Sequence, residues 1–531
     1  MTKFTKANWM TRALQEKLNV VGEQFRLARL RRDLTMDQVA QRAQCTRLTL
    51  SRLEKGEPTV SLGVVMRVLN ALQLEEDILH LAKDDKLGHM VQDLGIKNKK
   101  RASKRKRMDK LDVIATFDWM DKEEKVGTLG HEYLRGSDVF SFEFDKNWLK
   151  TFPKIDFGQD LRPYTGVQYS RDNHIFGCFS DALPDRWGRR LIDLRTSLEA
   201  EGKASHTLSD WDYLKGVEDE LRMGGFRFQN PDSGAFISST PSYSVPPAIH
   251  VDELLQAANE IEKSEYKHLE PEKKWVQRLF QPGSSMGGAR PKACVQSDGH
   301  LYLAKFPSVN DDINVSHWEH LAHLLAKECG INVAETQIIK AGNGQDILLS
   351  KRFDRTADNK RIHRASSLTV LGLTDGDGQR TGKGYLDIVD FIISRGGNHI
   401  EANLEELYKR VAFNICIGNT DDHFRNHSFL LGKEGWELSP AYDMNPTNGI
   451  FQALLIDTNT NDSSLNRLYN AHELYMLDER TARGIIIDVT RNMKYWEKMA
   501  ENIELPRREI KYFTERFEKG MEFHYGSGLH R

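Results

Sequence analysis

Three polar residues in the last quarter of the chain have the types and spacing that phosphoryl transfer requires. Asp421 lies in the segment GNTDDHFRNH, Asn426 follows five residues later, and Asp443 lies in AYDM. Phosphoryl transfer needs a carboxylate to receive the proton of the attacking hydroxyl, and an Asn and an Asp to hold magnesium against the phosphates. The spacing from Asp421 to Asn426 matches that of catalytic loops that perform this chemistry. The alternative is an Asp-rich loop with purely structural hydrogen bonds.

A glycine-rich segment, GSSMGGARPK at 283–292, precedes these residues. Glycines let a backbone curl around phosphate oxygens, and Arg and Lys side chains add positive charge. Its spacing and ending are not those of a Walker A loop. Such segments are also typical of ordinary turns. We assign four of its residues to nucleotide binding: Gly287, Gly288, Arg290 and Lys292.

Lys305 ends the segment LYLAKF, shortly after the glycine-rich segment. A lysine at the end of a strand in this position can reach nucleotide phosphates, and Glu319 on the following helix can orient it. The alternative is an ordinary surface ion pair, which contributes little to stability.

The elements that must position these residues form a mixed lobe followed by a helical lobe. Short alternating segments at 111–117 and 139–144 predict strands, and 251–263 predicts a helix. Residues 300–350 predict a strand, a helix at 317–329, and strands at 333–339 and 346–350. Residues 380–531 are mainly helical, interrupted by the polar segment 418–446. This is the order of elements in a two-lobed kinase.

Residues 20–82 predict a separate set of four helices. The first spans 20–31, with core positions at Val21, Phe25, Ala28 and Leu30. The pattern TMDQ at 35–38 is a capping box that opens a helix through 43. Thr46 can cap a third helix that ends near Gly56, and 61–72 predicts a fourth.

Two short helices joined by a tight turn, the second of which ends in SRLEKGEP, resemble the Cro/repressor type of helix-turn-helix. In that arrangement Leu50 and Leu53 pack inward over Val39 and Ala40, and the early residues of the third helix enter the major groove of DNA. Arginine can read guanine with two hydrogen bonds, and helix N-termini bind phosphate. A helical interaction domain that does not bind DNA is the alternative. The DNA-contacting residues that we assign are Gln38, Thr46, Arg47, Thr49, Ser51 and Arg52.

Charge is distributed unevenly along the chain. Residues 1–110 hold 24 basic and 13 acidic residues, an excess of 11 positive charges, whereas the remainder holds 51 and 64. The excess of positive charge in residues 1–110, next to an acidic remainder, indicates that this N-terminal part binds a polyanion. Nine of the basic residues lie in 97–110, which cannot bury apolar surface and is predicted to be a linker or an additional contact to DNA phosphate.

Composition excludes several classes of protein. Five cysteines lie far apart without a CxxC pair, which indicates reduced thiols rather than disulfides or a zinc site. No apolar run of transmembrane length and no signal-peptide core are visible, so we expect a cytoplasmic protein that does not enter the membrane.

Several motifs taken together resemble HipA-family serine/threonine kinase toxins. They are SSMGGARPK, YLAKFP, SKRFDR, NTDDHFRNHSFLL and LSPAYDMNP, preceded by FSDALPDRWGRRLI and GVEDELRMGGFRF, and they span about 111–510. The resemblance implies that Asp421 is the catalytic base, that Asn426 and Asp443 bind Mg²⁺, and that Lys305 contacts ATP. It also implies that the backbone around Lys351–Phe353 faces the adenine and that His423 contacts the nucleotide.

The resemblance further implies a site of autophosphorylation in the glycine-rich loop, which ejects the loop and stops activity. The aligned residue is Ser285, which we also assign to nucleotide binding, and Ser284 beside it is the alternative acceptor. Two departures from the family weaken the assignment of these roles to this chain. The loop reads GGARPK where well-known members have Gln and Glu before the Lys, and the repressor-type antitoxin HipB, usually a separate protein, is here fused to the chain.

The sequence thus predicts an α+β protein, with an all-α helix-turn-helix domain at 18–85, a basic linker at 86–110, a mixed α/β N-terminal lobe at 111–350 and a mainly helical C-terminal lobe at 351–531. The expected function is an ATP- and Mg²⁺-dependent protein kinase that binds duplex DNA at a palindromic operator, as a homodimer. The expected protein substrate is a translation factor or an aminoacyl-tRNA synthetase.

Two other classes of function remain open at this point. One is a DNA-binding autorepressor that uses a silent kinase domain as an oligomerisation scaffold. The other is a metal hydrolase built on Asp421, Asp422, His423 and His427.

Overall fold

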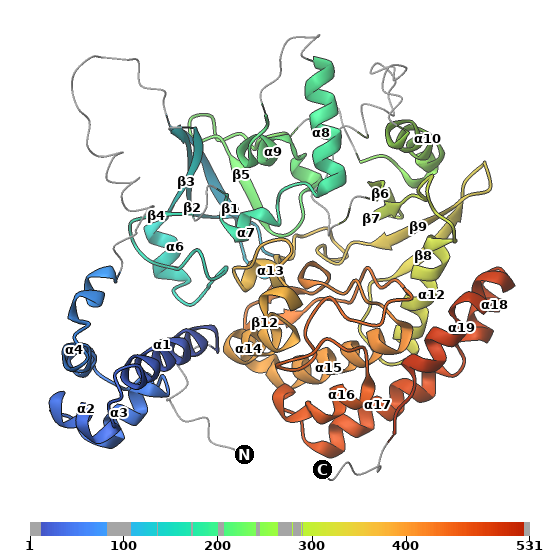
Figure 1. The fold of residues 1–531 in the computed structure, drawn as a ribbon. Coiled ribbons are helices and arrows are strands. Elements are labelled where there is room, and N and C mark those ends of the chain that lie inside the picture. Colours follow the sequence, from blue (N-terminus) through green and yellow to red (C-terminus); the bar gives the residue numbers. More distant parts are fainter. Residues whose placement is uncertain are drawn as a thin grey trace. The chain divides into compact units, whose positions relative to one another are not determined.

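The computed structural model describes residues 12–81, 108–134, 136–170, 174–199, 207–239, 245–263, 279, 288 and 290–524. The chain divides into two units, one within 1–105 and one within 106–531. Ser284, Ser285, Gly287 and most of the basic linker lie outside the described residues. Figure 1 shows the order of the elements.

The N-terminal unit consists of short helices closed by side-chain caps. Thr35 and Gln38 form the predicted capping box at the start of α2, and the Thr46 hydroxyl accepts the Thr49 N–H at the start of α3. Ser61 caps α4 in the same way. These caps satisfy N–H groups that a helix start leaves unpaired. The elements are α1 (Arg12–Leu30), α2 (Met36–Arg42), α3 (Arg47–Glu54), α4 (Leu62–Ala71) and the 3₁₀ helix η1 (Glu75–His80).

The core of this unit corrects the prediction for the first helix. Phe25 and Ala28 are buried as predicted, but Val21 and Leu30 are 42% and 44% exposed. The buried face of α1 instead runs through Gly22, where an added Cβ would lie 2.6 Å from the backbone nitrogen of Gly56. This close approach of α1 to the turn after α3 rotates Val21 and Leu30 toward solvent.

The larger unit begins with a five-stranded antiparallel sheet in the order β4-β3-β2-β1-β5. Buried aromatic residues of β3 and β5 pack against Phe179 of α7. The elements are β1 (Asp109–Ala115), β2 (Glu124–Leu134), β3 (Ser137–Phe144), α6 (Lys146–Thr151), β4 (Val167–Tyr169), α7 (Gly177–Ser180), α8 (Arg186–Glu199), α9 (Asp210–Gly216) and β5 (Phe226–Gln229).

A second sheet of four antiparallel strands has the order β6-β7-β9-β8. In its register Lys292 on β6 lies opposite Lys305 on β7, which brings the end of the glycine-rich segment beside the predicted phosphate lysine. The elements are α10 (Val251–Glu262), β6 (Lys292–Ser297), β7 (His300–Lys305), α12 (Val315–Glu328), β8 (Thr336–Lys340) and β9 (Asp346–Lys351).

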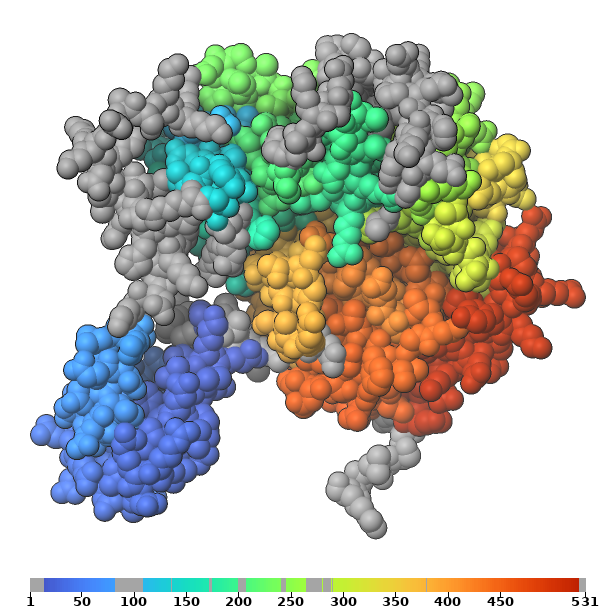
Figure 2. Space-filling model, turned by 45° about the horizontal axis from the view of Figure 1, so that its top comes forward, coloured from blue at the N-terminus to red at the C-terminus, as the bar shows by residue number. Residues whose placement is uncertain are grey.

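The C-terminal part is mainly helical, but it also contains a small sheet that the sequence did not predict. β10, β11 and β12 pair in that order; β11 and β12 directly follow the catalytic loop, and β10 precedes it in the chain. The elements are β10 (Arg364–Ser366), α13 (Ser367–Val370), α14 (Tyr385–Arg395), α15 (Ile400–Ile417), β11 (Ser428–Gly432), β12 (Gly435–Leu438), α16 (Leu465–Asn470), α17 (Glu479–Met493), α18 (Trp496–Asn502) and α19 (Arg507–Gly520). In the space-filling view these C-terminal helices form a continuous mass, coloured orange to red (Figure 2).

Two apolar cores hold the larger unit together. The larger core joins the first sheet to the C-terminal helices, from Leu111 to Phe517. The smaller core lies between α10 and the second sheet. α8 contributes to both, with Ile192 in the larger core and Trp187 and Leu191 in the smaller one. The second sheet, which carries Lys305, thus packs in the smaller core through Val295, Ala304, Ile347 and Leu349.

Candidate active site

Lys305 is the centre of a buried charge cluster. Its ammonium donates to Glu319 Oε1 on α12 at 2.5 Å and to Asp443 Oδ1 at 2.7 Å. Burial opposes the charge on Lys305, but the carboxylates of Asp443 and Glu319 outweigh burial and raise the pKa of the ammonium. The three predicted residues come from three separate segments, and the surface ion pair that was the alternative is excluded because Lys305 and Glu319 are buried.

Asp443 is held in an unusual backbone conformation. Its φ is +57°, in the left-handed region that costs a non-glycine residue free energy, and such residues concentrate at functional sites. Burial would raise the pKa of Asp443, but the positive charges of Lys305 and Lys292 lower it. The residue is thereby kept as a carboxylate facing the site.

Asn426 supplies a polar atom that has no partner in the protein. Its Nδ2 donates to the carbonyl of Asp421 at 3.2 Å, whereas its Oδ1 is buried and accepts no hydrogen bond from the described residues. The Oδ1 of Asn445 is buried and unpartnered in the same way. Carboxylate and amide oxygens are the ligands that Mg²⁺ takes from proteins. The donor set of Asp443 and Asn426 therefore fits a magnesium ion, because a bound cation would satisfy the orphaned oxygen.

The catalytic loop begins where α15 stops. Gly418 ends this helix with φ +68°, and an added Cβ would lie 2.5 Å from Arg516 Nε, so glycine is required there for both conformation and space. Asp421 follows and has an exposed side chain. Reduced solvation within the site, and after it the negative charges of Asp443 and Asp422, raise the pKa of Asp421 against the opposing effect of His423. A raised pKa suits a carboxylate that must accept a proton.

Asp422 has a different environment from its neighbour. Its Oδ2 is buried and accepts from Tyr385 on α14 at 2.6 Å, from Asn414 on α15 at 2.8 Å and from His427 at 2.9 Å. Burial opposes its charge, but His427 and the hydrogen bonds lower the pKa of Asp422. This residue anchors the loop to two helices and directs the Asp421 carboxylate to the opposite, open side.

His423 lies between these carboxylates. It is half-buried, and its Nδ1 has no hydrogen-bond partner among the described residues. Its charge lowers the pKa of Asp421, Asp422 and Asp443. This ring nitrogen is buried, so a phosphate group that entered the site would have to reach it from among these carboxylates.

Charged residues at the end of the glycine-rich segment are already paired. Lys292 donates to Asp185 Oδ2 at 2.7 Å, with side chains only 5% and 6% exposed, and to the carbonyl of Gly288 at 3.2 Å. Arg290 donates to the Asp311 carboxylate. The structure thus gives Lys292 a part in anchoring the loop backbone, which the sequence did not indicate because Asp185 lies 107 residues away.

An apolar patch lies beside the segment predicted to face adenine. Phe353 packs on Met223, Ala334 and Tyr442, and the rings of Phe353 and Tyr442 are 5.5 Å apart. This cluster is separate from both apolar cores. Lys351, two residues before, instead donates to Glu335 at the surface. Sequence reasoning missed Met223 and Tyr442, although Tyr442 stands next to Asp443 in the chain.

The helix-turn-helix unit presents its predicted DNA residues on and around α3. Leu50 and Leu53 are buried with Val39 and Ala40, as predicted. Arg47 and Arg52 are exposed, and each pairs loosely with an acid, Asp37 at 3.3 Å and Glu57 at 3.4 Å. Thr46 and Gln38 are exposed but already bonded within their helix caps, and Thr49 and Ser51 are half-buried.

Comparison with known proteins agrees with this geometry. Residues 284–497 match the model of the HipA-like C-terminal domain, and residues 20–81 match that of a helix-turn-helix domain. The chain therefore carries a HipA-like C-terminal domain and, nearer its N-terminus, a helix-turn-helix domain. Lys305, Glu319 and the catalytic segments all lie in the HipA-like range.

Individual relatives of this chain are distant. A Haemophilus influenzae protein named as a candidate kinase is 27% identical over 219 residues, which cover 36% of this chain and 63% of that protein. The serine/threonine-protein kinase toxin HipA of Shewanella oneidensis is 24% identical over 197 residues, which cover 32% of this chain and 45% of the toxin. The matched region is thus less than two thirds of either relative.

A solved structure extends the likeness in fold beyond the matched family range. The chain aligns with a structure of the Shewanella oneidensis toxin-antitoxin system HipA, HipB and its operator DNA, with a TM-score of 0.54 and 18% sequence identity, covering 77% of this chain and 96% of that one. The predicted α+β class, a helix-turn-helix domain followed by a HipA-like fold, is confirmed.

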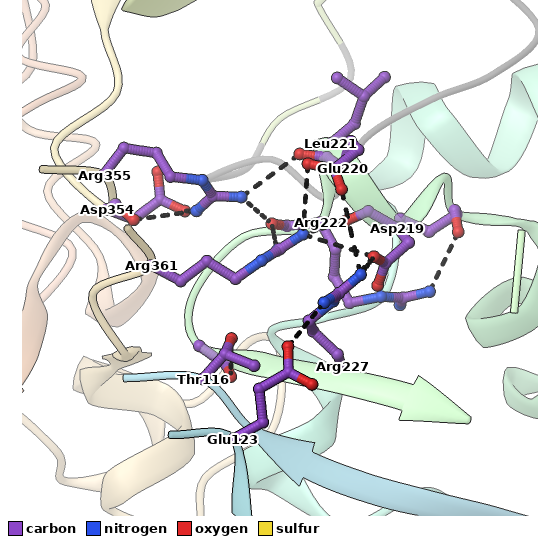
Figure 3. A network of polar contacts seen from close by, with 12 residues as sticks. Thr116, Glu123, Asp219, Glu220, Leu221, Arg222, Arg227, Asp354, Arg355 and Arg361 are labelled. Carbon is purple, nitrogen blue, oxygen red and sulfur yellow. Dashed lines mark hydrogen bonds and ion pairs between the residues drawn. The ribbon is translucent and has the colours of Figure 1, made fainter. Parts of the chain in front are cut away.

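Two segments that lack an obvious chemical role bind each other. The carbonyl of Arg222 accepts from Arg355 and Arg361, as Figure 3 shows, and also from Arg352. Asp354 in turn accepts from Arg352, Arg355 and the N–H of Gly224. The segments that contain ELRMGG and SKRFDR are thereby joined next to Phe353.

The metal-hydrolase alternative finds no support in this HipA-like site. In the described parts of the chain, no group of three or more His, Cys, Asp or Glu side chains is arranged to hold a metal. Asp422 and His427 are hydrogen-bonded to each other in the interior instead.

None of the described helices has the length and apolar character needed to cross a membrane.

Proposed function

We propose that this chain is an ATP- and Mg²⁺-dependent protein serine/threonine kinase of a toxin-antitoxin system, with DNA binding and kinase activity in one polypeptide. The observation that carries the proposal is the buried pair of ion pairs that Lys305 makes with Glu319 and Asp443. The unpartnered Oδ1 of Asn426 adds a candidate magnesium ligand. Lysine, helix glutamate, magnesium-binding Asp and Asn are the parts that kinases combine to hold ATP.

In this proposal each residue has a defined task. Asp421 accepts the proton of the substrate hydroxyl, and its raised pKa favours that transfer. Lys305 binds nucleotide phosphate while Glu319 holds its ammonium in place. Asp443 and Asn426 bind magnesium, which neutralises charge on the phosphates when it is bound. Phe353 and Tyr442 offer an apolar surface to the adenine.

The glycine-rich loop carries the regulatory part of the proposal. Autophosphorylation of Ser285, or of Ser284 beside it, would add about −1.5 to −2 charges next to the ATP phosphates. Repulsion between these groups lowers ATP affinity, so that activity declines as the enzyme modifies itself.

The helix-turn-helix unit is proposed to bind a palindromic operator as a homodimer in the cytoplasm. Support comes from the exposed Arg47 and Arg52 on α3 and from the excess of positive charge in residues 1–110. The solved Shewanella assembly contains a repressor-type partner, HipB, and operator DNA. We propose that the fused domain takes the part of HipB here, and that a translation factor or an aminoacyl-tRNA synthetase is the protein substrate.

A direct test combines intact-mass measurement with nucleotide binding. Wild type incubated with MgATP should gain phosphate, and Asp421→Asn should not, although it should bind ATP with unchanged affinity by calorimetry. Lys305→Met should lose affinity for ATP. Failure of wild type to bind MgATP would refute the proposal, and so would phosphate transfer by Asp421→Asn at the wild-type rate.

A further inference from the structure

A groove of about 820 Å³ lies next to the catalytic segments and is used by none of the residues assigned above. Its walls come from three parts of the chain: residues 310–313, residues 446–448, and the start of α19 at 508–513. The volume lies in the range of sites that hold small ligands or short peptide segments.

Both flanks of the groove are tied to the candidate active site. Thr447, in one wall, shares a hydrogen bond of 2.6 Å with Thr420, the residue before Asp421. Asp311, in the opposite wall, pairs with Arg290 at the end of the glycine-rich segment. One wall of the groove is therefore bonded to the residue that precedes Asp421, and the other to the end of the glycine-rich segment.

The α19 wall carries exposed positive charge without a counterion. Arg508 and Lys511 are exposed, and among the described residues neither has an ion-pair partner. The carboxylate of Glu509 between them does not neutralise them, because it is buried and accepts from the N–H of Asn314 and from Trp318 Nε1. A cationic surface of this kind favours an acidic partner.

The remaining lining indicates a polypeptide rather than a nucleic acid. Tyr512 is 59% exposed on the same wall, and aromatic residues are enriched where proteins bind proteins. Asp312 on the opposite wall is exposed, so an acidic segment would turn its carboxylates toward the α19 wall and its peptide N–H groups toward Asp312. Thr447 and Asn448 offer further polar contacts.

We propose that this groove docks an acidic segment of the protein substrate, next to the serine or threonine that is phosphorylated. The inference rests on the proposed kinase function and deepens it by naming the kind of substrate sequence. Arg508 and Lys511 recognise Asp or Glu side chains of the substrate, and the groove directs its hydroxyl toward Asp421.

The test uses the full chain and two short peptides with one serine each, flanked by Glu in one and by Gln in the other. Arg508→Glu combined with Lys511→Glu reverses the groove charge. Lys498→Glu combined with Lys519→Glu makes the same change of net charge at exposed positions that do not line the groove. We expect wild type to phosphorylate the Glu peptide with a lower KM than the Gln peptide. The groove variant should raise that KM roughly tenfold at low salt with kcat retained, because reversal replaces two attractions by two repulsions. The control pair should behave as wild type.

Peptide binding by fluorescence anisotropy separates this inference from the kinase proposal. If no peptide is phosphorylated but the groove variant alone loses binding of the Glu peptide, the docking surface stands and the kinase proposal fails. Equal KM and equal binding for both peptides in wild type would overturn the inference, as would an equal loss in both double variants. Single-stranded RNA that binds wild type and control but not the groove variant, with no preference for the Glu peptide, would overturn it in favour of a nucleic acid.

Discussion

The network of Figure 3 makes a quantitative prediction about Asp354. This carboxylate is the acidic partner of Arg352 and Arg355, whose side chains are 2% and 5% exposed. Asp354→Asn keeps the shape of the side chain but leaves both guanidinium groups without their carboxylate. Removing one partner of a buried ion pair costs about 3–5 kcal/mol. The carbonyls of Leu221 and Arg222 still accept from Arg352, which places the expected cost near the lower end, at about 3 kcal/mol.

The assay is urea unfolding followed by tryptophan fluorescence. Eight of the nine tryptophans lie in the larger unit and only Trp9 lies in the other, so the change reports mainly on the larger unit. Asp488→Asn is the matched control, because Asp488 pairs with Arg491 at the surface, with side chains 59% and 64% exposed. An exposed pair is worth less than about 1 kcal/mol.

The pH dependence provides a second criterion. Burial opposes the charge of Asp354, but Arg352 and Arg355 outweigh it and hold its pKa far below the ordinary value. A depressed carboxyl pKa contributes stability that is fully present above the unfolded pKa of about 3.9 and is lost as pH falls toward the folded pKa. The difference between wild type and Asp354→Asn should therefore be constant from about pH 5 to 8 and shrink in stronger acid. A loss no larger than that of Asp488→Asn would refute the reasoning that this network is a buried electrostatic joint.

Four other results are expected. Asp421→Asn should abolish phosphoryl transfer in a radiometric assay and leave the urea midpoint unchanged; a changed midpoint would mean that this exposed residue has a structural role. His363→Phe should stabilise the protein by about 1 kcal/mol, because both ring nitrogens of His363 are buried with no partner among the described residues. Burial lowers the His363 pKa to about 3, so the stability of wild type should fall below about pH 6.5, where the histidine of the unfolded chain binds a proton. The difference in stability between His363→Phe and wild type should therefore widen in acid. A fragment covering residues 1–110 should bind duplex DNA with affinity that falls steeply with salt, and Arg47→Ala should reduce its sequence preference; affinity independent of salt would contradict the proposed phosphate contacts. Phosphopeptide mapping after prolonged MgATP treatment should find phosphate on Ser285 or Ser284 in wild type but not in Asp421→Asn, and Ser285→Asp should bind ATP more weakly; an unmodified loop in active enzyme would contradict the switch.

The sequence predicted best those features that depend on near neighbours. The capping box at Thr35 and Gln38 and the cap at Thr46 need residues only three positions apart, and both are confirmed. The strand, helix and strands around Lys305 and Glu319 were also predictable, because each has a local period and the order of elements limits how they pair. Boundaries differ by one to three residues, as at β8, which begins at Thr336 rather than at 333.

Features that depend on distant partners could not be predicted in this way. Nothing near Lys292 indicates that Asp185 pairs with it, and nothing near Asp422 distinguishes it from Asp421. Only the positions of Tyr385 and Asn414 show which of the two carboxylates is buried. The small sheet of β10, β11 and β12 was missed because its strands are only three to five residues long and its first strand lies far from the other two.

The position of α8 between two apolar cores has a consequence for motion. Trp187 and Leu191 pack in the core of the second sheet, whereas Ile192 packs in the core that contains the catalytic helices. In Figure 1 this helix stands between the two sheets. Any hinge movement that opens the nucleotide site must therefore slide one face of α8 against its neighbours while the other face stays in place. Because α8 connects the two apolar cores, the rate of hydrogen exchange at its amides would report how often the site opens.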